Sequence, residues 1–220
     1  MVANEHTEHE RSHHIVDRIA GGETVALVSD AGMPGVSDPG QRVVAAVAAA
    51  GLAIEIIPGP TAVVAALVAS GLVNDRFVFE GFLDRKGAGR AKQLAEIATQ
   101  QRTTVFYESP KRVAKTLVDL LEVCGPDRAA AVARELTKLH ETTRRGTLAE
   151  LAVAVGESSP RGEYVIVVSG AAAVSVERTD DELIEMVEAE VAAGASRRDA
   201  IQAVADATGV PRRRVYDLSH

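Results

Sequence analysis

The segment most informative about the fold is residues 29–40, which read Ser29-Asp30-Ala31-Gly32-Met33-Pro34-Gly35-Val36-Ser37-Asp38-Pro39-Gly40. It leaves a β-rich run at residues 24–29 and enters a helical pattern. Loops beyond the carboxyl ends of parallel strands are where α/β folds bind ligands, and small residues let backbone groups approach a ligand closely. A tight connection would also use Gly and Pro. Because two Asp, three Gly and two Pro fall within these twelve residues, we favour a ligand-binding loop.

Outward from this loop, β-rich runs alternate with longer helical patterns, which predicts α/β layers. The further runs are 53–57, 77–80, 103–107, 129–134 and 164–169. Capping residues and first-turn prolines mark helix starts at 38–39 and 109–110, and residues 147–150 have the form of a capping box. After residue 170 the sequence is Ala-rich and charged without strand pattern, which predicts a three-helix tail.

These patterns predict two α/β domains and a C-terminal helical tail. We expect a partial N-terminal α/β domain at 1–74, a second α/β domain at 75–172 and the tail at 173–220. The first of these would hold only two strands, too few to bury both faces of a parallel sheet. We therefore expect part of the N-terminal domain to be absent from this chain.

Composition narrows the function classes. The 220 residues are 46% hydrophobic and 25% charged, which indicates a folded protein, and no apolar stretch is long enough to span a bilayer. We expect a cytoplasmic protein without a membrane partner. The net charge of −7 argues against indiscriminate binding to polyanions but allows local basic patches. The single cysteine, Cys124, cannot form an internal disulfide and has no neighbours at metal-ligand spacing.

Three further segments follow predicted strands, and each has an alternative interpretation. Pro58-Gly59-Pro60-Thr61-Ala62 opens a helix and is weak evidence alone. Residues 105–112 end a strand with an aromatic pair, Glu108 and a cap, as a core aromatic before a helix start would also do. Residues 133–142 combine charged, hydroxyl and imidazole groups, and a surface loop with ion pairs would look similar.

Taken in order, the motifs resemble those of a known family. They are Leu27-Val28-Ser29-Asp30-Ala31-Gly32-Met33-Pro34, Ser37-Asp38-Pro39-Gly40, Pro58-Gly59-Pro60, Phe79-Glu80-Gly81-Phe82, Phe106-Tyr107-Glu108-Ser109 and Ala133-Arg134-Glu135-Leu136-Thr137-Lys138. This series resembles the 16S rRNA (cytidine-2′-O)-methyltransferases of the tetrapyrrole-methylase superfamily. The resemblance implies two α/β domains with S-adenosylmethionine in the cleft between them, a homodimer, and 16S rRNA of the small ribosomal subunit as substrate.

The chain departs from the family at two places. Members begin with a strand, a Thr-Pro-Ile-Gly-Asn loop and a Glu-Asp-Thr-Arg segment, and this chain has neither motif. The first βαβ portion of the cofactor domain is therefore expected to be missing. In addition, Met33-Pro34-Gly35 stands where the family usually has Thr-Pro followed by a larger apolar residue.

The resemblance also implies roles for individual residues. The expected cofactor-binding residues are Asp30, Ala31, Gly32, Pro34, Pro58, Gly59, Phe106 and Tyr107. Transfer to a ribose hydroxyl benefits from a base that removes the proton, and the candidates are Glu108, Glu135 and Lys138, with His140 less favoured. The expected RNA-binding residues are Arg134, Lys111, Arg112, Arg212 and Arg213. No metal is required.

Other functions stay open at this point. A methyltransferase of the same fold could act on a tetrapyrrole or another small molecule, and a shortened chain could be a noncatalytic RNA-binding protein. His9-Glu10-Arg11-Ser12-His13 satisfies the zinc-protease pattern H-E-x-x-H. It is polar, lies near the N-terminus and has no third ligand at a family-like position, so a solvated helix is the preferred interpretation.

Overall fold

The computed structural model describes residues 8–157, 161–172 and 178–219, with side chains from residue 11 onward in these ranges. The described elements are α1 (Glu8–Ala20), α2 (Gln41–Ala49), α3 (Ala62–Ser70), β1 (Phe77–Phe82), α4 (Gly87–Thr99), β2 (Thr103–Glu108), α5 (Val113–Cys124), β3 (Ala129–Arg134), β4 (Thr142–Thr147), α6 (Leu148–Gly156), β5 (Tyr164–Val168), α7 (Asp180–Ala192), α8 (Arg197–Thr208) and α9 (Arg212–Leu218). Contacts divide the chain into two compact units, residues 1–171 and 172–220. A further boundary near residue 75 stays a prediction. No helix in the described ranges could cross a membrane.

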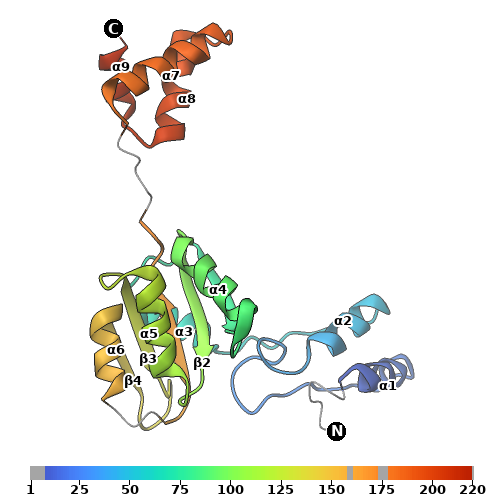
Figure 1. Ribbon diagram of the computed structural model, residues 1–220. Helices are drawn as coiled ribbons and strands as arrows, with labels where there is room; N and C mark the ends of the chain where they lie inside the picture. Colours follow the sequence, from blue (N-terminus) through green and yellow to red (C-terminus); the bar gives the residue numbers. More distant parts are fainter. Residues whose placement is uncertain (1–7, 158–160, 173–177, 220) are drawn as a thin grey trace. The chain divides into compact units, whose positions relative to one another are not determined.

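The first unit is built on a five-stranded sheet with the order β1-β2-β5-β3-β4. β1 and β2 are parallel, whereas β5 runs antiparallel to both of its neighbours, β2 and β3, and β4 is antiparallel to β3. Helices α4, α5 and α6 cover one face and α3 covers the other (Figure 1). The predicted α/β class is therefore confirmed, in the form of a mixed sheet.

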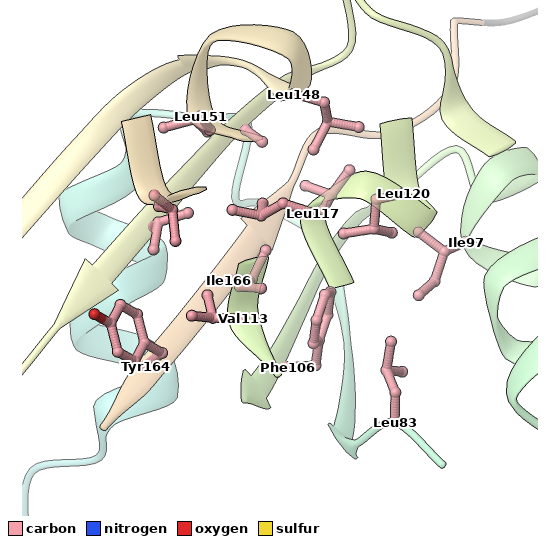
Figure 2. Close-up of a cluster of buried hydrophobic side chains, with 14 of the residues drawn as sticks. Leu83, Ile97, Phe106, Val113, Leu117, Leu120, Leu148, Leu151, Tyr164 and Ile166 are labelled. Atoms are coloured by element: carbon pink, nitrogen blue, oxygen red, sulfur yellow. The ribbon is translucent and has the colours of Figure 1, made fainter. Parts of the chain in front are cut away.

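The larger core lies between the sheet and α4, α5 and α6 (Figure 2). Phe106 and Ile166 from the sheet meet Leu117 and Leu120 from α5, and all four side chains are fully buried. β5 reads Tyr-Val-Ile-Val-Val and is buried on both faces, as expected for a central strand covered on both sides. On the opposite face α3 packs against β2, β3 and β5. The two cores together make the sheet the rigid part of the unit.

Four of the predicted strands are confirmed as β1, β2, β3 and β5. β4 was missed because its sequence, Thr-Thr-Arg-Arg-Gly-Thr, shows no apolar alternation. An edge strand of this kind is held by backbone hydrogen bonds to a single neighbour and needs no buried face.

The two strands predicted at residues 24–29 and 53–57 are wrong, because neither segment pairs into a sheet in the structure. Both segments expose apolar side chains, with Val28 82% exposed and Ile57 76% exposed. A strand requires a neighbour to satisfy its backbone groups, and local propensity cannot supply one. The β-branched pattern therefore does not predict a sheet strand in these two segments.

Helix starts were predicted with mixed success. The capping box at Thr147 and Glu150 is present at the start of α6. α2 begins at Gln41, after Gly40, because the Asp38 carboxylate hydrogen-bonds the Ser29 hydroxyl instead of capping the helix. α5 begins at Val113, and residues 110–112 form a turn before it.

The C-terminal unit confirms the predicted three-helix tail. α7, α8 and α9 enclose their own small core, which includes Leu183, Ile201 and Val215. Ser196 caps α8 as expected, accepting a hydrogen bond from the Asp199 N–H at 3.2 Å. The H-E-x-x-H segment lies within α1, so its interpretation as part of a helix is confirmed.

We expect Leu117→Ala to lower the free energy of unfolding of the first unit by about 2–5 kcal/mol, because it removes a fully buried side chain and leaves a cavity. Val118→Ala, on the same helix but with Val118 44% exposed, should change it by less than about 0.5 kcal/mol. Urea titration followed by the amide NMR signals of β5 measures both variants. Equal effects of the two substitutions would contradict the packing described here.

Candidate functional site

The functional loops gather at one edge of the sheet. Glu108 and Arg134, at the ends of β2 and β3, are both paired with Tyr164 at the start of β5. The parallel strand β1 ends at this edge beside β2. The loops after β1, β2 and β3 therefore lie along one edge, together with residues 161–163 before β5. This is the position at which α/β sheets bind ligands.

Two loops from the N-terminal part of the unit approach each other. A Cβ built on Gly32 would lie 3.9 Å from the Pro60 carbonyl oxygen, so residues 29–40 and 58–61 are neighbours. The Ala31 N–H also donates to the Ser29 hydroxyl at 3.3 Å, which tightens the start of the first loop. Ala31, Gly32 and Gly59 are exposed, so their backbone groups are accessible to a ligand.

The first loop reaches the end of β1, and the start of α3 reaches β2. The Ser37 hydroxyl lies 3.4 Å from the position of a Cβ on Gly81, and the Val63 backbone hydrogen-bonds the Tyr107 side chain. Burial raises the pKa of the Tyr107 phenol, more than the hydrogen bond from Val63 lowers it, and nearby Asp38 adds to the rise. Tyr107 therefore stays neutral and serves as the contact between the loops and the sheet.

The two aromatic residues expected in the cofactor cleft lie on opposite faces of β2. Phe106 is fully buried in the core with α4, α5 and α6 (Figure 2), so only its backbone is available to a ligand. Tyr107 is partly buried on the α3 face. The alternation of side chains along a strand makes this separation unavoidable for adjacent residues.

Glu108 lies in a buried hydrogen-bond network. Its carboxylate accepts from the Ser109 N–H at 2.7 Å and from the Thr116 hydroxyl at 2.7 Å, and it lies 3.3 Å from the Arg112 Nε. With its side chain 1% exposed, Glu108 holds the loop after β2 against α5. Its expected catalytic role stays a prediction.

Arg112 connects this network to the neighbouring loop. Its Nη2 donates to the carbonyl oxygens of Leu83 at 2.8 Å and Asp84 at 3.1 Å. Arg112 makes these internal contacts with its side chain 25% exposed, and its expected RNA contact stays a prediction. The adjacent Lys111 is exposed. Arg112 fixes the loop after β1 beside the loop after β2.

A second ion-pair network joins α4 and α5. Arg90 donates to the Thr116 hydroxyl at 3.0 Å and to the Asp119 carboxylate at 2.6 Å, and Lys115 lies 2.7 Å from the same carboxylate. Burial alone would raise the pKa of Asp119, but the hydrogen bonds from Lys115 and Arg90 lower it below the ordinary value. Asp119 is therefore ionised and ties α4 to α5.

The segment after β3 forms a charged cluster with the turn before β5. Lys138 Nζ lies 3.2 Å from the Glu135 carboxylate and 3.0 Å from that of Glu163. The Glu163 N–H donates to Glu135 at 2.9 Å, and the Arg134 Nε donates to the Arg161 carbonyl at 2.9 Å. Arg134, Glu135 and Lys138 are expected to act on the substrate. Through these contacts they also hold the segment after β3 against the turn before β5.

These contacts fix the protonation states. The hydrogen bond from the Glu163 backbone, followed by that from Lys138, lowers the pKa of Glu135. Hydrogen bonds to Glu163 and then Glu135 raise the pKa of Lys138. At neutral pH the pair is therefore a carboxylate and an ammonium. A cation of this kind cannot accept a proton, so Lys138 is not a base in this arrangement.

Gly162 makes the cluster possible. Its φ is +84°, and a Cβ at this position would lie 2.4 Å from the Glu135 side chain. Glu135 itself has a φ of +51°, which is uncommon for a residue with a side chain. Strain of this kind concentrates at functional sites. Neither Gly162 nor Glu163 lies in a motif of the sequence, and the only signal was their position just before a β-rich run.

The remaining RNA candidates, Arg212 and Arg213, belong to the C-terminal unit. Both are exposed at the start of α9, and Arg213 lies 4.0 Å from the Asp217 carboxylate. They form part of a basic run that includes Arg214, which pairs with Asp180 at 2.8 Å.

The fold and its loops define a methylase class, and comparison with known proteins agrees. A family model for Tetrapyrrole (Corrin/Porphyrin) Methylases matches residues 2–152. Among solved structures, the methyltransferase CobJ superposes with a TM-score of 0.56 at 27% identity, covering 78% of this chain and 74% of that one. A uroporphyrin-III C-methyltransferase from Thermus thermophilus, complexed with S-adenosylhomocysteine, shares the fold with a TM-score of 0.50 at 20% identity, covering 74% and 73% of the two chains.

Sequence relatives define the family more narrowly. The ribosomal RNA small subunit methyltransferase I of Synechocystis is 43% identical over 98% of this chain and 78% of its own length. The protein of that name from Mycobacterium tuberculosis H37Rv is 50% identical over 92% of this chain and 70% of its own length, and that from Bacillus subtilis is 38% identical over 99% and 76%. The chain therefore belongs to the ribosomal RNA small subunit methyltransferase I family of tetrapyrrole methylases.

The hydrogen bond between the Glu163 N–H and the Glu135 carboxylate gives a direct prediction. The Glu163 amide proton should shift with pH, with a midpoint below the ordinary pKa of a glutamate, because the pKa of Glu135 is lowered. The stabilisation is present above the unfolded-state pKa and is lost as pH falls through the folded-state pKa. An acid titration of amide NMR spectra measures this shift, and Glu135→Gln should abolish it. A midpoint at or above the ordinary value would contradict the cluster.

Proposed function

We propose that this chain transfers a methyl group from S-adenosylmethionine to the 2′-hydroxyl of a cytidine in 16S rRNA of the small ribosomal subunit. The observation that carries the proposal is the family membership over nearly the whole chain, at up to 50% identity to proteins named as small-subunit rRNA methyltransferases. The loops at the sheet edge supply residues suited to this reaction. With an rRNA substrate, we also propose a cytoplasmic location.

The loops at 29–40 and 58–61 fit the cofactor. A Cβ at Gly59 would meet nothing within 4 Å, so this side of the loop is open, and a Cβ at Gly32 would point toward Pro60. Backbone groups at these glycines suit an adenosine, and the exposed Asp30 carboxylate suits hydroxyl or ammonium groups. The cofactor-binding set is Asp30, Ala31, Gly32, Pro34, Pro58, Gly59, the Phe106 backbone and Tyr107.

When bound, S-adenosylmethionine supplies a methyl group that is already activated by the positive charge on sulfur. The protein residues then have to place the ribose hydroxyl in line, exclude water and accept the proton. No residue needs to form a covalent bond to the methyl group. Positioning and proton removal are therefore the tasks left to the charged cluster after β3.

Within that cluster we assign proton removal to Glu135. Among the described residues, its hydrogen bonds from the Lys138 Nζ and the Glu163 N–H both reach Oε1, which leaves Oε2 for a substrate hydroxyl. Lys138, as a cation, stabilises negative charge at the reacting oxygen or a neighbouring phosphate. Arg134 and the exposed Lys111 contact RNA phosphates, with Arg212 and Arg213 of the C-terminal unit contributing further contacts.

We also propose that the protein is a homodimer. α3 is apolar on all sides, and its Val64 and Val68 form an exposed stripe at 52% and 65% exposure. A helix that is apolar all round is normally buried, so this stripe favours a protein partner. A second copy of the chain is the partner that the family resemblance implies.

The test separates chemistry from cofactor binding. We expect Glu135→Gln to lower methyl transfer to unmethylated small subunits by about 100-fold or more, because it removes the base while keeping the shape. Lys138→Gln should lower it by at least about tenfold. Binding of S-adenosylhomocysteine, measured by calorimetry, should change by less than about twofold in both variants. Tritium transfer from labelled S-adenosylmethionine gives the rates.

Lys92→Gln is the matched control, because Lys92 on α4 forms an exposed pair with Glu96 at 3.7 Å, and it should leave both quantities unchanged. An equal loss of transfer and cofactor binding in Glu135→Gln would remove the assignment of Glu135. If the wild-type chain binds S-adenosylhomocysteine but methylates a porphyrin instead of rRNA, the proposed substrate is wrong.

A further inference from the structure

A β-bulge near the end of β1 determines where an aromatic side chain points. Phe79 is paired with Val105 and Phe82 with Tyr107, so three steps along β1 match two steps along β2. The extra residue falls at Glu80 and Gly81, and Gly81 has a φ of +64°. In a regular strand, residues three apart face opposite sides of the sheet. The bulge instead brings Phe79 and Phe82 to the same face.

The result is an aromatic cluster beside the two loops. The Phe79 ring meets Tyr107 edge-on with centroids 5.2 Å apart, and the Phe82 ring meets it at 5.5 Å with a tilt of 53°. Tyr107 is on the α3 face, in contact with the Val63 backbone, and Ser37 lies against Gly81. Phe82 nevertheless remains 54% exposed. A ring that is fixed by packing and open on one side is suited to stacking.

Basic residues lie on the two loops that follow the ends of β1 and β2. Arg85 and Lys86 follow Phe82 on the loop after β1, and Lys111 lies on the loop after β2, which Arg112 holds against Leu83 and Asp84. In the part of the chain that the structure describes, Arg85, Lys86 and Lys111 have no carboxylate partner.

We propose that Phe82 is a stacking platform for a base of single-stranded rRNA, with Arg85, Lys86 and Lys111 contacting the adjoining phosphates. The inference rests on the proposed function and adds a substrate-binding residue to it. Sequence-tolerant recognition of single strands combines aromatic stacking with a positively charged path for the backbone. S-adenosylmethionine carries no phosphate and a single carboxylate, so it can pair with at most a part of these three cations. A single-stranded RNA can stack a base on the Phe82 ring and contact the cations through its phosphates.

The experiment measures RNA binding and cofactor binding separately on the full chain. We expect Phe82→Ala to weaken binding of a fluorescein-labelled single-stranded RNA of about ten nucleotides by between about fivefold and about 150-fold, the range for loss of one stacked base. Binding of S-adenosylhomocysteine should change by less than about twofold. Phe82→Tyr keeps the ring and should restore RNA binding. Fluorescence anisotropy and calorimetry give the two dissociation constants.

The cations are tested through salt dependence. Lys86→Ala should lower the slope of log affinity against log salt concentration by about 0.7, the value for one phosphate contact with a single strand. Lys92→Ala should leave this slope unchanged, because Lys92 pairs with Glu96 on the exposed side of α4. Phe77→Ala is the control for the ring, since Phe77 is 40% exposed at the start of the same strand and distant from the bulge.

Three results would overturn the inference. They are a loss of S-adenosylhomocysteine binding in Phe82→Ala without a loss of RNA binding, unchanged RNA binding in that variant, and equal losses in Phe82→Ala and Phe77→Ala. Failure of the proposed function gives a different result, because the wild-type chain itself would then not methylate small subunits. The RNA-binding comparison would still decide the role of Phe82.

Discussion

The arrangement of the site depends on the burial of β5 between β2 and β3. β5 is apolar along its whole length and is covered on both faces, so it occupies the centre of the sheet. Because it runs antiparallel to both neighbours, the ends of β2 and β3 meet its start. The charged cluster after β3 and the network after β2 are thereby placed on either side of Tyr164. A polar residue within β5 would weaken both cores and the alignment of the two loops.

Two polar networks hold the loops at this edge of the sheet in place. Glu108 and Arg112 tie the loops after β1 and β2 to each other, and Glu135 with Lys138 ties the loop after β3 to the turn before β5. A buried carboxylate such as Glu108 is tolerated only because its oxygens are hydrogen-bonded. The networks differ in exposure: that of Glu108 is closed to solvent, whereas Lys138 is 43% exposed at its side chain. The second is therefore the network to which we assign the chemistry.

Sequence reasoning succeeded where local pattern and tertiary structure agree. The β-rich runs of β2, β3 and β5 are buried, and the capping box of α6 is a local interaction that four residues define. It failed where strand formation depends on a neighbouring strand. Residues 24–29 and 53–57 have strand propensity but no paired strand. At the site, the motifs located the loops but not the contacts within them. The roles of Glu163 and Gly162 depend on tertiary packing that no local pattern encodes.

Tertiary contacts also decide which charged side chains remain available to a ligand. A chain with net charge −7 that acts on RNA cannot rely on overall attraction, so the position of individual cations decides where the polyanion lies. Many cations of the first unit are neutralised by carboxylates, as Arg90 and Lys115 are by Asp119. Arg85, Lys86 and Lys111 adjoin the edge where the loops meet. Internal ion pairing therefore offsets positive charge on α4 and α5, whereas Arg85, Lys86 and Lys111 keep theirs on the loops after β1 and β2.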